Sequence, residues 1–334
     1  MQTISGKRNH RSPVATVVIP VAGRGTRLFP ATKVVPKVLV PVGRKPLLLY
    51  AIEEAVASGA ERIVVVTNHQ DSLIRSFPEA DSDLERTLVA SGRLQDVALL
   101  RAVAAAVPIV FVRQDEPRGL ADSIRCARSE TGDAAFGVIL PDALITGEVP
   151  CLGQLIEFYL RHPGFVIATR HLHPDETEHY GILVTERYTG GPGESVLRVK
   201  SMVEKPKPEA APSLYGVFGR YILEPTIFDS IDRIEPDSSG ELQITDALNL
   251  CCSQHQVYGF EFTGEHFDCD EWLGYARATV DRFLADQDIG QELRAHLWTV
   301  LAGTEKVCCA TRGLAIEHVQ SLPVKLGEVE EREY

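Results

Sequence analysis

The sequence predicts an α/β fold with a Rossmann-like, mixed but mostly parallel sheet and helices on both faces. Short apolar, β-branched segments alternate with helical segments from Ala15 to about Arg170, as in successive βαβ units. Between Tyr180 and Tyr221 the pattern becomes antiparallel, which predicts a small antiparallel subregion. Beyond about Phe283 the chain is helical in character to about Leu301, so a helical C-terminal extension is expected.

Five short strands are expected in the alternating part. Their apolar runs are Val17–Val21, Ile63–Thr67, Pro108–Val112, Phe136–Leu140 and Phe165–Thr169. Helices are expected over Leu47–Ser58, over the Ala/Leu/Arg-rich insertion Asp83–Val107, and over Leu120–Arg128. A turn is expected in the antiparallel part, at Gly190-Gly191-Pro192-Gly193.

Length and composition are those of an ordinary globular chain, with 334 residues, 44% hydrophobic and 24% charged. There is no run of about 18 apolar residues, so no membrane span is expected. The net charge of −12 argues against a nucleic-acid polymer as partner. Residues 1–13 are polar and basic, which predicts a disordered leader. The main domain is then expected over 14–285, with a helical extension and acidic tail over 286–334.

The cysteines support neither a zinc site nor a disulfide framework. There are seven of them, an odd number, and no C-x-x-C spacing occurs. Reduced thiols are therefore expected, and with them a cytoplasmic location.

A glycine-rich turn, Ala22-Gly23-Arg24-Gly25-Thr26-Arg27, directly follows the first strand. Such a turn bends sharply, and its N–H groups can form an anion-binding nest. Arg27 and Lys37 add positive charge, so a triphosphate is a suitable ligand. The turn is not a P-loop, which needs Gly-Lys-Ser/Thr. Nor is it a dinucleotide fingerprint, because Phe29 and Pro30 stand where that fingerprint's helix would begin.

The full spacing G-x-G-T-R-x-x-P-x-T-x-x-x-P-K, from Gly23 to Lys37, resembles the signature of the sugar-phosphate nucleotidyltransferases. Within that family it is most similar to the UTP–glucose-1-phosphate uridylyltransferases, and the similarity continues through Gly240–Ala247. The resemblance implies transfer from a nucleoside triphosphate, with UTP favoured, to a sugar 1-phosphate, with glucose 1-phosphate favoured, releasing pyrophosphate. It implies Mg²⁺ as cofactor, and a homo-oligomer is expected.

The nucleotide is expected to contact the glycine turn and the end of the third strand. Gln114 ends that strand, and its amide can donate and accept at once, which matches the imide edge of uracil or thymine. In full, the nucleotide-binding candidates are Ala22, Gly23, Gly25, Thr26, Gln114 and Gly119. The reaction needs alignment and charge neutralisation but no base, because the attacking phosphate is already an anion. The catalytic candidates are accordingly Arg27, Lys37 and Lys205.

Two aspartates are candidate magnesium ligands. Asp142 follows the strand Phe136–Leu140, and ligands of open α/β sheets bind beyond the carboxyl ends of strands. Magnesium usually takes one or two carboxylates plus phosphates. The resemblance implies that Asp268 completes this metal site. It also implies that the sugar phosphate is held by Gly181, Glu204 and Lys205.

Three positions depart from the family pattern. Asp270 stands where relatives usually have glycine, Leu214 replaces an asparagine, and Val38 replaces a glutamate after Pro-Lys. These departures leave two alternatives open. One is a specialised nucleotidyltransferase for another sugar or cyclitol phosphate. The other is a catalytically weak, nucleotide-sugar-binding regulatory homologue.

Overall fold

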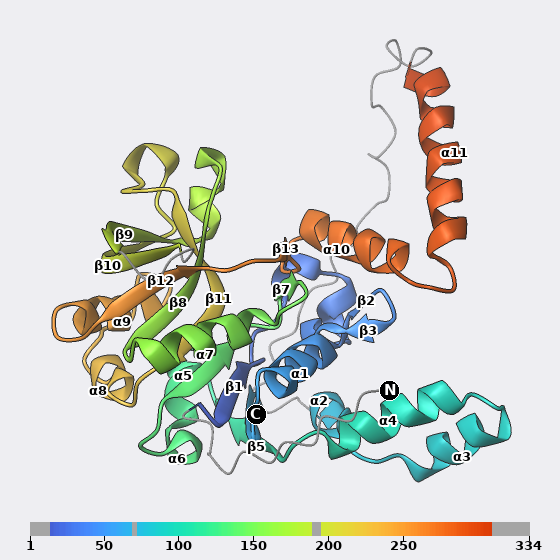
Figure 1. Cartoon of the computed structure of the whole chain (residues 1–334), viewed down its shortest axis with the longest axis horizontal. Coiled ribbons are helices and arrows are strands. Elements are labelled where there is room, and N and C mark those ends of the chain that lie inside the picture. The colour runs from blue at the N-terminus through green and yellow to red at the C-terminus, as the bar shows by residue number, and fades with distance from the viewer. Residues whose placement is uncertain (1–13, 69–71, 189–194, 309–334) are drawn as a thin grey trace, which may run out of the picture. The chain divides into compact units, whose positions relative to one another are not determined.

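The computed structural model describes residues 14–68, 72–188 and 195–308 (Figure 1). Residues 1–282 form one compact unit and residues 283–334 a second. The predicted leader, the turn at Gly190–Gly193 and the acidic tail lie outside the described residues. The domain bounds expected from the sequence, 14–285 and 286–334, stay a prediction.

A nine-stranded mixed sheet forms the centre of the first unit, in the order β5-β4-β1-β6-β11-β8-β12-β10-β9. In chain order the strands are β1 Thr16–Pro20, β4 Arg62–Thr67, β5 Ile109–Arg113, β6 Phe136–Ile139, β8 Phe165–His171, β9 Gly181–Tyr188, β10 Val196–Glu204, β11 Tyr215–Leu223 and β12 Val257–Glu261. Two small antiparallel sheets join β2 Pro41–Val42 to β3 Lys45–Pro46, and β7 Ala143–Thr146 to β13 Glu265–Asp268. All five predicted strands are present, within one or two residues at each end.

The pairing directions divide the sheet into two parts. Strands β5, β4, β1 and β6 are parallel, as the sequence predicts. β11 then pairs antiparallel with both β6 and β8, and β10 pairs antiparallel with β12 and β9. β8 and β12 are parallel. A mostly parallel sheet is therefore correct for the N-terminal part. Beyond it the prediction fails, because a strand from the antiparallel segment lies between β6 and β8.

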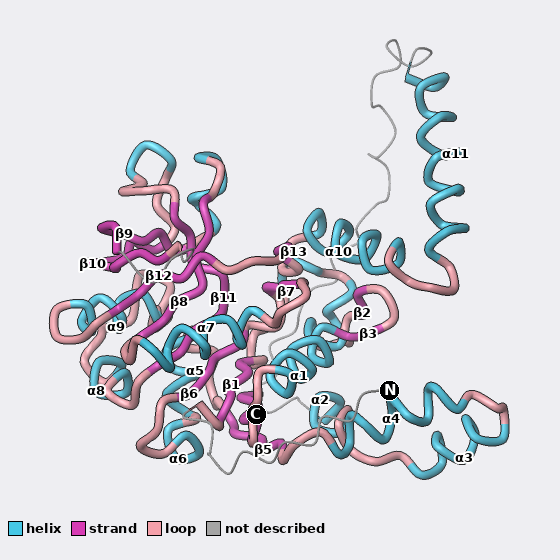
Figure 2. The backbone as a smooth tube through the Cα atoms, viewed as in Figure 1, coloured by secondary structure: helices cyan, strands magenta, loops and turns pink. Residues whose placement is uncertain are grey.

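Helices cover both faces of the sheet, as Figure 2 shows. Val17 and Ile19 of β1 belong to one buried cluster and Val18 to the other, as expected for a strand with alternating side chains. On the first face pack α1 Leu47–Ala57 and α7 Cys151–Arg161. On the second face pack α5 Leu120–Cys126, α8 Ile227–Ile231 and α9 Ile244–Cys252.

α2 Ser72–Ser76 adds Ile74 to the buried cluster on the first face. The remaining helices are α3 Ser82–Ala90, α4 Leu94–Ala105, α6 Arg128–Thr131, α10 Trp272–Leu284 and, in the second unit, α11 Gly290–Cys308. The predicted insertion is thus two helices and not one. It breaks at Gly92, whose φ of 70° does not belong to an α-helix. Asp81 caps α3 by accepting hydrogen bonds from Asp83 N and Leu84 N.

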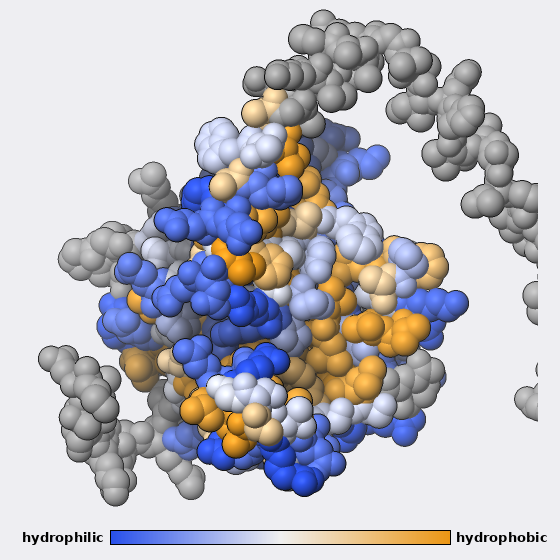
Figure 3. All heavy atoms as spheres, turned by 90° about the vertical axis from the view of Figure 1, so that its right-hand side faces the viewer, coloured by the Kyte–Doolittle hydropathy of each residue, from blue (hydrophilic) through white to orange (hydrophobic). Residues whose placement is uncertain are grey.

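The surface mixes hydrophilic and hydrophobic side chains, as the face drawn in Figure 3 shows. Large apolar side chains are exposed at scattered positions, including Val34 (77%) and Trp298 (70%). Scattered exposure of this kind is normal for globular proteins. None of the described helices is long and apolar enough to cross a bilayer.

Candidate active site

The glycine turn after β1 leads into three short 3₁₀ turns, Thr26–Leu28, Ala31–Lys33 and Lys37–Leu39. Gly25 has a φ of 62°, and a Cβ at this position would lie 2.9 Å from the Cβ of Lys37. The Thr32 hydroxyl donates to the Gly25 carbonyl at 2.7 Å. Gly25 is therefore needed both for the turn and for the close packing of Lys37 beneath it.

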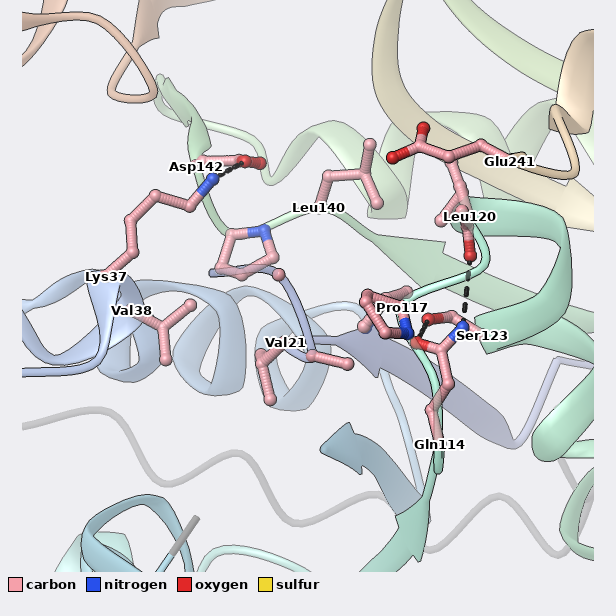
Figure 4. A pocket seen from close by; sticks show the side chains of 15 residues that line it. Val21, Lys37, Val38, Gln114, Pro117, Leu120, Ser123, Leu140, Asp142 and Glu241 are labelled. Carbon is pink, nitrogen blue, oxygen red and sulfur yellow. Dashed lines mark hydrogen bonds and ion pairs between the residues drawn. The ribbon is translucent and has the colours of Figure 1, made fainter. Parts of the chain in front are cut away.

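A cavity of about 310 Å³, the first cavity, opens beside this turn (Figure 4). It lies at the carboxyl ends of β1, β5 and β6. Figure 4 shows the Lys37–Asp142 pair on one side of it and Gln114 with Ser123 on the other. Its lining residues are Pro20–Gly23, Lys37, Val38, Gln114, Pro117, Gly119, Leu120, Ser123, Leu140–Asp142 and Glu241.

Lys37 is held between two carboxylates. Its Nζ lies 2.6 Å from Asp142 Oδ2 and 2.7 Å from Asp270 Oδ1, and its side chain is only 12% exposed. Burial by itself lowers the pKa of Lys37, but the two carboxylates outweigh it and hold the pKa well above its ordinary value. Lys37 is therefore a fixed cation at the meeting point of the phosphate and metal candidates.

Asp270 contacts two of the predicted catalytic cations, Lys37 and Arg27. Its second oxygen lies 3.2 Å from Arg27 Nη1, which also lies 3.3 Å from Glu271 Oε1. Relatives usually have glycine at this position. Here the Asp270 carboxylate pairs with Lys37 and Arg27, the side chains that would otherwise bind an anionic ligand. From the sequence, the extra carboxylate of Asp270 was expected near Asp268. Its pairing with the two cations was not predicted.

Gln114 is 2% exposed and both ends of its amide have partners. Nε2 donates to Asp122 Oδ2 at 2.7 Å and to the Gly119 carbonyl at 3.3 Å. Oε1 accepts from the Ser123 hydroxyl at 2.6 Å. Gln114 and Gly119 were predicted from the sequence. Asp122 and Ser123 were not, although these two residues lie in the helix that begins after Gly119.

Gly119 is required by its surroundings as well as by its backbone. Its φ is 89°, and an added Cβ would lie 2.7 Å from the Leu242 carbonyl oxygen. The same carbonyl accepts from Ala121 N at 3.1 Å, so this N–H is not free for a ligand. The helix ends at Cys126 and not at the predicted Arg128.

A second cavity, of about 280 Å³, adjoins the first. The two share Leu120, Leu140, Asp142 and Glu241. Beyond these, the second cavity is lined by residues from the glycine turn, from β9–β11, from the Gln243–Thr245 segment and from β13. They include Arg27, His179–Gly181, Glu204, Lys205, Val217–Gly219, Tyr221, Gln243–Thr245, His266, Asp268 and Asp270.

The predicted sugar-phosphate residues gather in the second cavity. Lys205 is about half exposed and has a φ of 43°, unusual for a residue with a side chain. Its Nζ lies 3.6 Å from Glu204 Oε1, while Glu204 Oε2 accepts from the Thr245 hydroxyl at 3.1 Å. A Cβ on Gly181 would lie 3.0 Å from the Thr245 methyl carbon, so glycine keeps this wall of the cavity open.

Asp142 and Asp268 come together because β7 and β13 pair. Asp268 lies opposite Ala143 in that pairing, and Cys269 N donates to the Asp142 carbonyl at 2.8 Å. Burial raises the pKa of Asp268, opposed by a hydrogen bond from Asp270 N and reinforced by the nearby carboxylates. Burial acts likewise on Asp142, but Lys37 outweighs it and lowers that pKa. An added divalent cation would relieve the repulsion at Asp268.

No cluster of three or more metal-binding side chains occurs within residues 14–68, 72–188 and 195–308. The donor set at this position is instead two carboxylates beside the phosphate candidates. That set fits magnesium, which commonly takes its remaining ligands from phosphates and water.

A buried ion pair behind Asp142 was missed from the sequence. Arg220 of β11 donates to both oxygens of Glu54 of α1 at 2.8 and 2.9 Å, and its Nη1 donates to the Leu140 carbonyl at 3.0 Å. Arg220 is 1% exposed. It therefore fixes the strand end that carries Asp142. The two partners of this ion pair are 166 residues apart, so no local sequence pattern predicts their contact.

His266, another residue missed from the sequence, lines the second cavity as a neutral side chain. Burial, together with Arg220 and Arg170, lowers its pKa to about 3. It cannot serve as a cation for phosphate near neutral pH. Arg27 and Lys205 are the cationic side chains among the residues that line this cavity.

A third cavity, of about 550 Å³, lies along the glycine turn and includes Ala22, Gly23, Arg24, Lys33 and Gln114. Of the predicted nucleotide residues, Gly25 and Thr26 line none of the three cavities. For Gly25 the contact with Lys37 explains the glycine; Thr26 begins the first 3₁₀ turn and is exposed.

The chain is similar to known proteins over most of its length. Residues 16–292 match the protein family described as Nucleotidyl transferase. The chain is 35% identical over 282 residues to the UTP–glucose-1-phosphate uridylyltransferase of Mycoplasma genitalium, covering 84% of this chain and 96% of that protein. The enzyme of the same name from Bacillus subtilis is 34% identical over 280 residues, covering 84% and 94%.

Solved structures show the same fold. A UDP-glucose pyrophosphorylase complexed with UDP-glucose has a TM-score of 0.75 at 30% identity, covering 82% of this chain and 100% of that one. The UTP-bound enzyme from Acinetobacter baumannii has a TM-score of 0.77 at 30% identity, covering 85% and 99%. With the glycine turn, the paired cavities and these similarities together, the chain belongs to the nucleotidyl transferase family.

Proposed function

We propose that this protein converts UTP and glucose 1-phosphate to UDP-glucose and pyrophosphate. The observation that carries the proposal is that two cavities of different lining meet at Asp142. The first has the glycine turn and Gln114, which suit a nucleotide, and the second has Glu204 and Lys205, which suit a sugar phosphate. The names of the relatives, and the ligands of their solved structures, supply the two substrates.

The reaction is a displacement at the α-phosphorus of the nucleotide. An anionic oxygen of the sugar phosphate forms the new P–O bond, while the bond from that phosphorus to the bridging oxygen of the β-phosphate breaks. Pyrophosphate leaves with the electron pair, and no proton has to move. The chain therefore has to align the two substrates and neutralise their charge.

Each cationic side chain has a separate part in this proposal. Lys37 faces the first cavity and Asp142, so it neutralises charge near the nucleotide phosphates. Arg27 lines the second cavity close to Asp270 and stands between the two substrates. Lys205 binds the acceptor phosphate as a point charge, and Glu204 accepts hydrogen bonds from sugar hydroxyls.

Asp142 and Asp268 are the residues that would hold Mg²⁺. When bound, the ion would offset the negative charge of the substrate phosphates. Asp142 also pairs with Lys37. Asp268, whose pKa is raised mainly by burial, is the carboxylate that gains most from a cation.

Asp270 gives the rival function its strongest support. It occupies Lys37 and Arg27 together, and both are needed for phosphate in the proposed mechanism. In a catalytically weak homologue this pairing would persist with nucleotide present. In an enzyme, the triphosphate displaces Asp270 from the two cations.

The other alternative, an enzyme for a different sugar, has weaker support. It depends on the departures from the family pattern at Val38 and Leu214. Val38 lines the first cavity and not the second. Leu214 accepts a backbone hydrogen bond from Leu172 and is not among the residues that line the second cavity. Glucose 1-phosphate therefore stays the first choice of acceptor.

The test is pyrophosphate release across a panel of nucleotides and sugar phosphates, with Mg²⁺ present. UTP with glucose 1-phosphate should give the highest kcat/KM, and UTP or dTTP should exceed GTP and ATP. No release with any pair, while UDP-glucose still binds in calorimetry, would favour the regulatory homologue. The mass of the protein in solution tests the expected homo-oligomer.

A further inference from the structure

We propose that Asp122 is a specificity-determining residue that fixes the orientation of the Gln114 amide. In this orientation the first cavity accepts a base that offers an N–H donor and rejects one that offers a lone pair. The inference rests on the proposed function, in which Gln114 contacts the base of the nucleotide. Asp122 itself acts through Gln114 and is a positioning residue.

One end of the amide is fixed by two acceptors. Asp122 lies in the first turn of α5 and is 5% exposed. Its Oδ2 lies 2.7 Å from Gln114 Nε2, and its Oδ1 accepts from the guanidinium of Arg125. The Gly119 carbonyl oxygen lies 3.3 Å from the same Nε2. A carboxylate and a carbonyl can only accept, so the NH₂ end of the amide must face them.

The other end of the amide keeps one free acceptor site. Gln114 Oε1 takes one hydrogen bond, from the Ser123 hydroxyl at 2.6 Å. An amide oxygen has two lone pairs, so one remains for a ligand. Gln114 lines the first cavity beside Ser123, as Figure 4 shows. A base in this cavity therefore meets an acceptor.

A free acceptor at Gln114 Oε1 distinguishes the bases by the group that they present to it. Uracil and thymine carry an N–H at N3, which donates to Oε1. Cytosine has a lone pair at N3 and adenine has one at N1, so both would set two acceptors against each other. A site built around a hydrogen bond discriminates strongly against a base that cannot make it, because its buried groups are then left unpaired.

The decisive variant is Asp122→Asn, which keeps the shape of the side chain but adds a donor. In the flipped orientation the new amide can donate to Gln114 Oε1, and Ser123 Oγ can accept from Nε2. The Gly119 carbonyl, whose contact with Nε2 is the longer one at 3.3 Å, is then the one acceptor that still opposes the flip. We expect the ratio of kcat/KM for UTP over CTP to fall at least about tenfold, with the CTP value rising in absolute terms.

A merely structural defect would lower both nucleotides together and leave this ratio unchanged. Asp229→Asn is the matched control, because it removes an exposed carboxylate that pairs only at 3.4 Å with Arg128. Its ratio should equal that of the wild type. A folded Asp122→Asn protein whose ratio stays within about twofold of the wild type would overturn the inference.

A second test needs no variant and so does not depend on the folding of Asp122→Asn. In the 3-methyl derivative of UTP a methyl group replaces the N3 proton, so this analogue should be as poor a substrate as CTP. Wild-type protein that uses CTP or the analogue as well as UTP would overturn the inference and leave the proposed function standing. If UTP itself gives no product, the proposed function fails. Calorimetry then tests the inference separately: wild-type protein should bind UTP more tightly than CTP, and Asp122→Asn should lose that preference.

Discussion

The two cavities are built in different ways. The first is assembled mainly from the ends of parallel strands and the loops that follow them. Of the side chains that line it, Gln114 and Ser123 bind each other, and Gln114 also binds the buried Asp122. The second is assembled from antiparallel strands, α9 and β13, and its Lys205 is half exposed. The first cavity therefore has a fixed pattern of donors and acceptors. In the second, the exposed Lys205 has only a 3.6 Å contact with Glu204 and can adjust to a ligand.

Asp142 belongs to both cavities, so changing it should have the largest effect. Asp142→Asn should lower kcat at least about 10³-fold, because it removes a metal ligand and the partner of Lys37. The chain should still fold, since the side chain is 27% exposed at a strand end. Pyrophosphate release and a thermal melt measure the two effects, and activity above a tenth of the wild-type value would exclude this role.

Asp268→Asn tests whether Asp268 is the second magnesium ligand beside Asp142. It should raise the magnesium concentration that gives half-maximal rate, because only Asp142 would then remain as a carboxylate ligand. A magnesium titration of each variant measures this. If the titration of Asp268→Asn matches that of the wild type, Asp268 is not a metal ligand.

Lys37→Ala tests the first cavity alone. A fixed cation that meets charge growing in the transition state contributes roughly 2.7–4 kcal/mol, so kcat should fall about 10²–10³-fold. Lys45→Ala is the matched control, because Lys45 pairs with Glu53 away from the three cavities. A loss of less than about threefold at saturating substrates would show that Lys37 has only a structural part.

Lys205→Ala tests the second cavity alone. It should raise KM for glucose 1-phosphate about tenfold and leave KM for UTP unchanged, since a half-exposed charge pair is weakened by solvent. Lys207→Ala, two residues along the chain, is the control. Equal rises in both KM values would mean that the two cavities are not separate substrate sites.

Asp270→Gly should have the smallest effect of these variants, and it should improve the enzyme where the others impair it. Freeing Lys37 and Arg27 should lower KM for UTP and the magnesium requirement by up to about fivefold, with turnover kept or improved. Asp270→Asn separates the loss of charge from the gain of backbone freedom. A wild-type protein that is inactive on the whole panel, yet active as Asp270→Gly, would instead support the regulatory alternative.

The sequence predicts the first cavity better than the second for a physical reason. Gly25, Lys37 and the strand before them lie within one short segment, so their spacing already specifies the turn and the cation. Gln114 was found because it ends a recognisable strand. Asp122 was missed because a helical aspartate looks like any acid in a first turn, and only the fold shows that it faces Gln114.

Contacts between distant segments account for most of what the sequence did not predict. Asp270 and Lys37 are separated by 233 residues, so nothing local indicates that they pair. The insertion of β11 between β6 and β8 likewise depends on long-range pairing, which periodicity does not reveal. Periodicity identifies strands and their faces, whereas their neighbours depend on the whole topology.

The pairing of Arg220 with Glu54 has a consequence for synthesis of the chain on the ribosome. Glu54 is made 166 residues before its partner. At usual rates of translation the wait is about 10–30 s. During that time α1 carries an acidic group without its counter-charge, and β6, once it has been made, has no neighbour on the side that β11 will join. Arg220 can hold the Leu140 carbonyl, and with it the strand end that carries Asp142, only after β11 has left the ribosome, so we expect nucleotide binding only after that point.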